Sequence, residues 1–277
     1  MDDSTNPIST NNKIFSMKTI TVKGKVIKLY DSIDEMPITN FQKYNKYILL
    51  DVGLGSDVNS VDEHIVNLAK LIKTDMTKAQ QELQNLRQNM HMIVSGISPK
   101  YMAFAALIQS IDGKLLDNLS DDYLREVLDS IREIKHSTIA SFLLWVKKKL
   151  ESELETYFPS EFGSAKEKEV YDKLKQRTIL VLQGIIEDKD TSAEVAEIDD
   201  FLFSLHNPKS FIGSASAEVK YEKQFETSCM LISQKTGMTA KKMTVLEFYN
   251  TLTNIGKQAE AELKAHKRIN YHGSRRR

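Results

Sequence analysis

The segment "YILLDVGLGSDVNSVDEHI", residues 47–65, has the residue types that could build a phosphate-binding loop. Its apolar start predicts a strand, Gly53 and Gly55 predict a turn, and the residues from Ser60 onward predict a helix. A phosphate loop needs backbone N–H groups that converge on one anion at the start of such a helix. The segment therefore raises the question of whether this turn holds a nucleotide.

The residues that follow the glycines argue against a bound nucleotide. Asp57, Asp62 and Glu63 would bring three carboxylates close to the phosphates and repel them. The third glycine of the dinucleotide-binding pattern is replaced by Val58. The spacing of Asp51 and Asp57 does not fit the alternating oxygen ligands of a calcium-binding EF-hand. We therefore expect the glycines to supply unusual backbone angles and Ser60 to cap the helix.

The remaining candidates for chemistry are isolated residues. Glu133 and His136 form half of a di-iron helix signature, but the sequence contains no second Glu-x-x-His. His64 and His91 lie far apart on predicted helices, and Cys229 falls on the apolar stripe of its helix, where a small core residue is expected. We therefore predict no cofactor, no metal and no enzymatic activity.

Composition limits the class of protein. The 277 residues are 41% hydrophobic, which is enough for a sizeable core. The 38 basic and 38 acidic residues balance, so no overall charge draws the chain to nucleic acid or membrane. A single cysteine forms no internal disulfide and fits a reducing compartment. The longest apolar runs fall short of the ~20 residues that a membrane span needs, and no apolar signal core is expected at the start.

The periodicity predicts a mainly α fold, a multi-helix bundle with a small N-terminal β-hairpin over residues 18–30. The turn of that hairpin is predicted at Lys23–Gly24. The run "YMAFAALIQSI" (101–111) is apolar all round and predicts a buried helix. Other helices are predicted to begin at Ser60, near Thr77 and at Ser120, and to span 137–158, 165–187, 192–205, 216–235 and 244–270.

These elements predict five regions along the chain. The regions are a disordered start (1–16), a β-hairpin with an irregular segment (17–59), a helical domain (60–158), a second helical region with a C-terminal helical hairpin turning at Gly237 (165–270), and a basic tail (271–277).

The C-terminal region contains the candidate interaction surface. "TVLE" (244–247) is a capping box that opens the final helix. We expect its apolar stripe to pack against the preceding helix, and the arginines at the chain end either to reach phosphates or an acidic partner or to form a solvated, frayed end. The residues of this candidate surface are Leu246, Tyr249, Leu252, Arg275, Arg276 and Arg277.

A second candidate contact is the methionine-containing stripe "LRQNMHMIV" (86–94). Methionine is flexible and fits adaptable contact surfaces as well as cores. Packing in the core is the favoured interpretation.

Three stretches resemble virion proteins of Bacteroides phages, including the crAss-like group. Two of them form one block, which covers "IDEMPITNFQKYNKYILLDVGLGSDVNSVDEHIVNLAKLI" (33–72) and "ELQNLRQNMHMIVSGISPKYMAFAALIQSIDGK" (82–114). The third, "MTVLEFYNTLTNIGKQAEAE" (243–262), resembles the helix ends of small helical proteins of the phage tail region. Together they cover about half of the chain, and none of these motifs is catalytic.

The resemblance implies a structural or packaged component of a short-tailed phage virion, tail-associated or cargo. The implied partners are other virion proteins of the tail, portal or ring, with a homo-oligomer in the particle and a non-specific DNA contact through the basic tail. The implied locations are the virion and, during assembly, the host cytoplasm. The alternatives are a tail assembly chaperone or scaffold, a connector ring subunit, and, as the least favoured, an enzyme delivered to the host.

Overall fold

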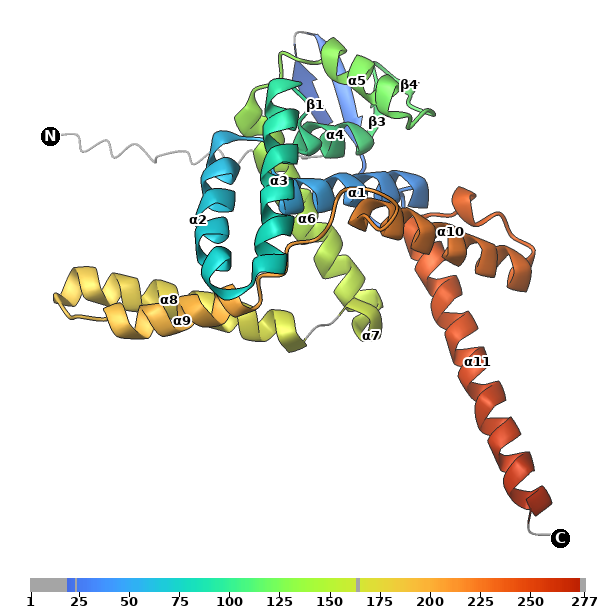
Figure 1. The fold of residues 1–277 in the computed structure, drawn as a ribbon. Coiled ribbons are helices and arrows are strands. Elements are labelled where there is room, and N and C mark those ends of the chain that lie inside the picture. The colour runs from blue at the N-terminus through green and yellow to red at the C-terminus, as the bar shows by residue number, and fades with distance from the viewer. Residues whose placement is uncertain (1–18, 23, 163–164, 275–277) are drawn as a thin grey trace, which may run out of the picture.

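The computed structural model describes residues 19–22, 24–162 and 165–274, and the described chain is mainly α-helical, as predicted (Figure 1). The expected disordered start (1–16) and the predicted contact residues Arg275, Arg276 and Arg277 lie outside these ranges. The elements are β1 (Thr19–Val22), β2 (Lys25–Leu29), α1 (Ile38–Leu54), α2 (Val58–Thr74), α3 (Met76–Val94), α4 (Pro99–Ala106), β3 (Ile108–Ile111), β4 (Lys114–Leu115), α5 (Asp121–Ser130), α6 (His136–Tyr157), α7 (Pro159–Phe162), α8 (Ala165–Glu187), α9 (Ser192–Ser204), α10 (Ala217–Thr236), the 3₁₀-helix η1 (Ala240–Lys242) and α11 (Val245–Ser274).

The predicted N-terminal hairpin is confirmed. β1 and β2 pair antiparallel, with Val22 opposite Lys25 across a two-residue turn. Gly24 in that turn has a φ of 82°, which glycine adopts without steric cost. Ile27 and Leu29 alternate with exposed residues and are fully buried, so one face of the hairpin belongs to the core.

The hairpin is part of a larger sheet, with the order β1-β2-β3-β4, because the apolar run 101–111 is not one helix. α4 ends within the run and β3 follows, pairing Ile111 with Ile27 of β2. An apolar run without alternation does not reveal its period, so the sequence prediction was wrong here. Asp112 and Gly113, with φ values of 50° and 80°, form the two-residue turn to β4 that Asp-Gly favours.

Helix α1 corrects a second prediction. Residues 38–54 were expected to be irregular, with a strand before Gly53, but they form a continuous helix of 17 residues. Its buried side chains recur every three or four positions, as a helix with one buried face requires. This periodicity outweighs the β-forming side chains of the segment. Pro37, in an extended conformation, is the N-cap residue.

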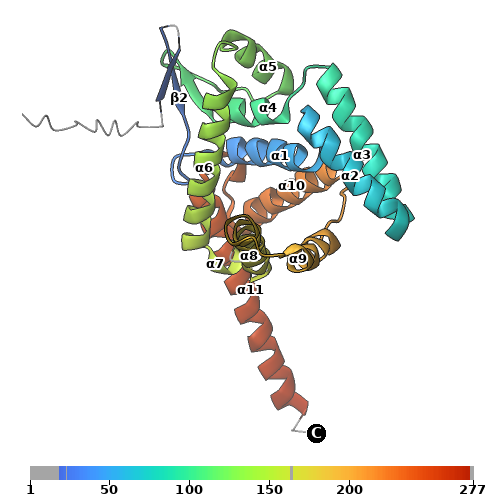
Figure 2. The same cartoon turned by 90° about the vertical axis from the view of Figure 1, so that its left-hand side faces the viewer.

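The core is centred on α4. Every residue from Ala103 to Ile108 has no exposed surface. Figure 2 shows α1 between α4 on one side and α10 on the other, with α6 crossing beside them. The ring of Phe104 meets the ring of Phe142 from α6 edge to face, at 5.7 Å between centroids. The central body therefore consists of α1, α4, α5, α6, α10 and the sheet.

Two helical elements project from this body. Figure 1 shows the antiparallel pair α8 and α9 extending to one side and α11 extending away from the body at another point. α11 begins beside the middle of α10, where the rings of Phe225 and Phe248 are 5.8 Å apart, and then runs away from that helix (Figure 1). The predicted antiparallel packing is therefore limited to the base of α11. Within the described residues, no helix combines the length and apolarity that a bilayer crossing requires.

Candidate functional site

The Gly53–Ser60 turn serves packing and capping. Gly53 lies within α1, and a Cβ there would come within 2.2 Å of Cζ of Phe211, from the loop before α10. Gly55, with a φ of 65°, ends the helix. The residue that caps α2 is Asp57 rather than the predicted Ser60, because the Asp57 carboxylate accepts from the Ser60 N–H at 2.8 Å. That bond lowers the pKa of Asp57.

A buried polar network lies beside this turn and joins α2, α3 and the loop after α9. The Glu82 side chain is almost completely buried, with 1% exposed. One of its oxygens is 2.9 Å from Nδ1 of His64, and the other is 3.4 Å from Nε2 of His206. Nε2 of His64 lies 2.9 Å from the carbonyl oxygen of Leu54. Both ring nitrogens of His64 therefore face oxygen acceptors, which the protonated imidazolium satisfies.

The ionisation of this pair follows from its contacts. The hydrogen bond with Glu82 raises the pKa of His64. Burial alone would raise the pKa of Glu82, but its bonds with His64 and His206 lower it overall. A buried carboxylate against an imidazolium keeps the local charge balanced. The arrangement therefore favours a structural ion pair, and His64 was predicted only as an isolated histidine.

Two asparagines of α3 extend the same buried face. Nδ2 of Asn85 donates to the carbonyl oxygen of Lys209 at 3.1 Å. Nδ2 of Asn89 donates to Oγ of Ser60 at 2.7 Å, and its amide oxygen is buried without a hydrogen-bond partner. A polar cavity of about 340 Å³ opens beside the network and is also lined by Asp51, whose pKa is raised by burial. α3 thus packs against the body through polar side chains.

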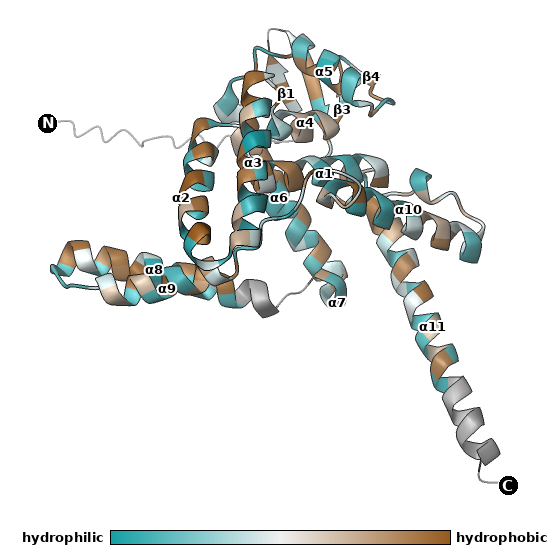
Figure 3. Cartoon of the chain, in the orientation of Figure 1, coloured by the Kyte–Doolittle hydropathy of each residue, from teal (hydrophilic) through white to brown (hydrophobic). Residues whose placement is uncertain are grey.

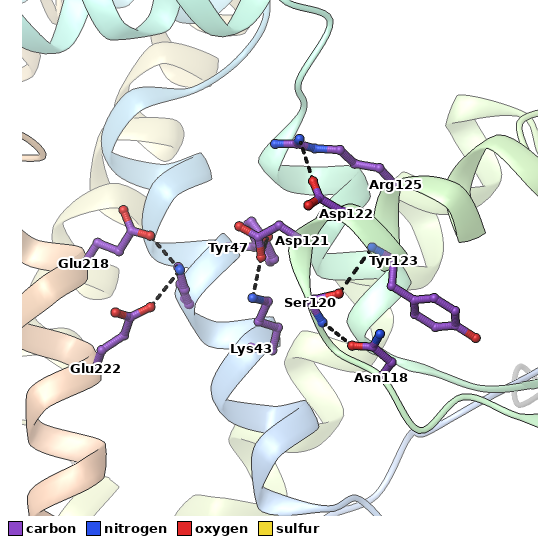
Figure 4. Close-up of polar contacts among 11 residues, drawn as sticks. Lys43, Tyr47, Asn118, Ser120, Asp121, Asp122, Tyr123, Arg125, Glu218 and Glu222 are labelled. Atoms are coloured by element: carbon purple, nitrogen blue, oxygen red, sulfur yellow. Dashed lines mark hydrogen bonds and ion pairs between the residues drawn. The ribbon is translucent and has the colours of Figure 1, made fainter.

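A second polar cluster fastens two elements to α1 (Figure 4). Nζ of Lys46, which is 8% exposed, lies 2.6 Å from Glu218 and 2.7 Å from Glu222 of α10. Burial alone would lower the pKa of Lys46, but hydrogen bonds with the two glutamates raise it overall. At the next residue of α1, Oη of Tyr47 donates to Asp121 of α5 at 2.7 Å. The charged side chains of this cluster therefore pair with one another and hold α5 and α10 against α1.

Lys43 pairs with the same Asp121 carboxylate, and the start of α5 is capped as predicted (Figure 4). Oγ of Ser120 accepts from the N–H of Tyr123 at 3.4 Å. The N–H of Ser120 donates to the side chain of Asn118 at 2.9 Å.

The other predicted candidates also occupy structural positions. His136 opens α6 with its ring 5.1 Å from that of Tyr101, beside a cavity of about 470 Å³ between α4, α5 and α6. His91 is exposed. Cys229 is buried in the core, as predicted, and burial raises the pKa of its thiol. Among the described residues, no cluster of three His, Cys, Asp or Glu side chains could hold a metal ion.

The apolar residues of the predicted contact surface on α11 pack against the body. Leu246, Tyr249 and Leu252 are partly buried against the core. The ring of Tyr249 lies among four aromatic rings, at centroid distances of 5.1 to 6.3 Å. The predicted capping box is present, since the N–H of Thr244 donates to Glu247 at 2.9 Å and Oγ1 of Thr244 accepts in return.

Beyond this base, the described side chains of α11 are not covered by any described part of the chain. Every residue from 256 to 264 is exposed, and Leu263 is exposed by 61%. Helices in proteins draw most of their stability from packing of one face. The described outer residues of α11, from 256 to 264, therefore gain no such packing from the described part of the chain.

The α8–α9 pair is also largely exposed. Of its described side chains and those of its turn, only Thr191 and Ile198 are buried. Arg177 and Asp199 tie the two helices together, with Nε 2.5 Å from Oδ1. Near the tip, Ile185 and Ile186 are 74% and 78% exposed. Figure 3 shows hydrophobic residues at intervals along this pair. Sequence periodicity predicted both helices but could not show that most of their described side chains are exposed or only partly buried.

Comparison of the chain with protein-family models, with curated proteins and with solved structures gave no match. The proposals below therefore rest on the residues, on their arrangement and on the sequence resemblance described above.

Proposed function

We propose that this chain is a non-enzymatic assembly protein that acts through helix-mediated contacts with other proteins. The observation that carries the proposal is the pair of projections, α8–α9 and α11, whose outer residues are exposed. Burying an exposed isoleucine against a partner contributes about 1.5–3 kcal/mol at most. Ile185 and Ile186 alone therefore provide a favourable contact surface for a partner.

The sequence resemblance supplies the biological setting of the proposal. We propose a virion protein of a short-tailed phage, tail-associated or packaged as cargo, whose partners are tail, portal or ring components. In this setting the α8–α9 pair, with Ile185 and Ile186 exposed near its tip, binds a neighbouring virion protein. The arginines Arg275, Arg276 and Arg277 make a salt-sensitive contact with a partner or with DNA.

Quantitative mass spectrometry of purified particles tests the proposal. The double variant Ile185→Asp/Ile186→Asp should reduce the amount of the chain per particle at least tenfold. Gln176→Asp, at an exposed polar position of the same helix, is the matched control and should leave the amount unchanged. Absence of the wild-type chain from particles would refute the virion role and favour a chaperone or scaffold, whereas a fixed copy number typical of a ring would favour a connector subunit.

The enzyme alternative is tested separately by alanine substitution of Asp57, Asp62, Glu63 and His64. In the proposal Asp57 is a helix cap and His64 is a member of a structural network. Variants that remain folded should be incorporated and function normally in infection. Loss of infection by particles that contain a normal amount of a folded variant would favour chemistry at these residues.

A further inference from the structure

The hairpin of α2 and α3 buries polar side chains and exposes large apolar ones. Its inner face, toward the body, contains the buried polar side chains Glu82, Asn85 and Asn89 together with His64. Large apolar side chains lie on its solvent-exposed side, exposed by 47% to 86%. We call this set the outer face, and its members are Val58, Ile65 and Ile72 of α2 and Met76, Leu83, Met90 and Val94 of α3. Figure 2 shows α2 and α3 at one edge of the body.

The spacing of the outer face is that of helices which pack in bundles. Val58, Ile65 and Ile72 are seven residues apart on α2, and Met76, Leu83 and Met90 are seven apart on α3. A seven-residue repeat keeps the apolar side chains on one side of a helix that packs at a small crossing angle. A second repeat, which includes Leu68 and Leu86, is partly buried. A four-helix bundle buries two such repeats on each helix. The two helices of this hairpin therefore correspond to half of a four-helix bundle.

Two opposite charges on the outer face lie at the same level. The contacts Ser60–Asn89, at 2.7 Å, and His64–Glu82, at 2.9 Å, are two successive links between α2 and α3. Asp62 of α2 lies between these links along the chain, and so does Arg87 of α3. Both charged residues are exposed, and neither forms an ion pair within the described part of the chain.

This arrangement is self-complementary under a two-fold rotation. A two-fold axis that runs parallel to the helices places α2 of one copy against α3 of the other and preserves the level of each residue. Asp62 of each copy then faces Arg87 of the other, while apolar residues of α2 meet apolar residues of α3. Two-fold contacts of this kind use the same surface on both subunits.

The size of the face is sufficient for such a contact. α2 contains 17 residues, about 25 Å at 1.5 Å per residue, and two helices side by side are roughly 20 Å wide. The footprint is therefore about 500 Å² per copy and ~1,000 Å² over both, which reaches the lower limit of specific interfaces.

We infer that the outer face binds a second copy of this chain and forms a four-helix contact between two α2–α3 hairpins. The inference deepens the proposed assembly role, on which it rests, by naming the partner and the surface. The occupant is a second copy because the face supplies both members of its charge pair at matching positions.

A charge exchange in the full chain tests this geometry by sedimentation over roughly 1 μM to 1 mM, the range of weak to standard contacts. The wild-type chain should dimerise. Arg87→Asp and Asp62→Arg should each weaken the dimer at least tenfold, about 1.4 kcal/mol, because each variant opposes like charges twice. A mixture of the two variants should dimerise again, since both pairs are restored in the mixed dimer.

Two further variants distinguish loss of the contact surface from a general effect of an introduced charge. Leu83→Glu should abolish the dimer, whereas Leu115→Glu, the same change at an exposed position of β4, should leave it intact. A wild-type monomer over the whole range, a higher oligomer, or a mixture that does not dimerise would each overturn the inference. A monomer in solution combined with normal recovery from particles would overturn only this contact, whereas absence from particles would overturn the assembly role.

Discussion

Replacement of the buried carboxylate by an amide, Glu82→Gln, gives a sharp test of the network that holds the α2–α3 hairpin. The side chain keeps its volume and loses its charge. Hydrogen bonds to a charged group contribute about 1.5–3 kcal/mol each. Glu82 lies 2.9 Å from His64 and is almost fully buried, so solvent screens this bond weakly. We expect the free energy of unfolding to fall by roughly 2 kcal/mol near pH 6.

The pH dependence follows from the directions of the two pKa shifts. The raised pKa of His64 means that its contribution is complete below the ordinary value of 6.5 and is lost as pH rises through the folded value. The lowered pKa of Glu82 means that its contribution is complete above the ordinary value of 4.5 and is lost as pH falls through the folded value. Both contributions are complete between these ordinary values.

Urea unfolding at pH 6 and pH 9 measures the effect. The difference in stability between wild type and Glu82→Gln should be largest at pH 6 and should shrink towards pH 9 as His64 loses its proton. Glu126→Gln, the same change at an exposed position of α5, is the control and should alter stability little at either pH. An equal loss from Glu82→Gln at both pH values would refute the ion pair and leave only neutral hydrogen bonds.

Two further predictions concern packing. Gly53→Ala should lower the free energy of unfolding by ~1–2 kcal/mol, because its Cβ would meet the Phe211 ring. Urea unfolding measures this cost. In a background that already contains Phe211→Ala, Gly53→Ala should cost nothing further. Leu252→Ala should lower the melting temperature by about 4–8 °C, a loss of about 2 kcal/mol, whereas the same change at exposed Leu263 should not. Removal of residues 274–277 should leave melting unchanged but weaken a salt-sensitive contact in a binding titration; destabilisation as large as that of Leu252→Ala would refute the docking role of the tail.

The sequence predicted helices well where a cap and a repeat agree. Ser120 marks the start of α5, and Thr244 with Glu247 marks the start of α11. α1 was missed although its buried residues follow a helical repeat, because aromatic residues, Pro37 and Gly53 together indicated strand and turn. Beyond the apolar run, the Asp112–Gly113 turn signal between β3 and β4 was present and would have indicated a hairpin there.

The site was less predictable than the elements, because its members are distant in sequence. Glu82 meets His64 across 18 residues and His206 across 124. Periodicity identifies the apolar face of a helix but not what covers it. The stripe around Met90 was therefore expected in the core, whereas Met90 is 53% exposed. Met92, two positions on, packs against the core.

The two faces of the α2–α3 hairpin are physically linked. The inner network fixes how far α3 slides along α2, because His64 and Ser60 each bind one residue of α3. That offset places Asp62 and Arg87 at one level on the outer face. A shift by one turn, about 5.4 Å, would separate the two charges beyond contact in the two-fold pair. The buried polar contacts thus set the register of the apolar surface, a role that apolar packing, which tolerates sliding, would perform less well.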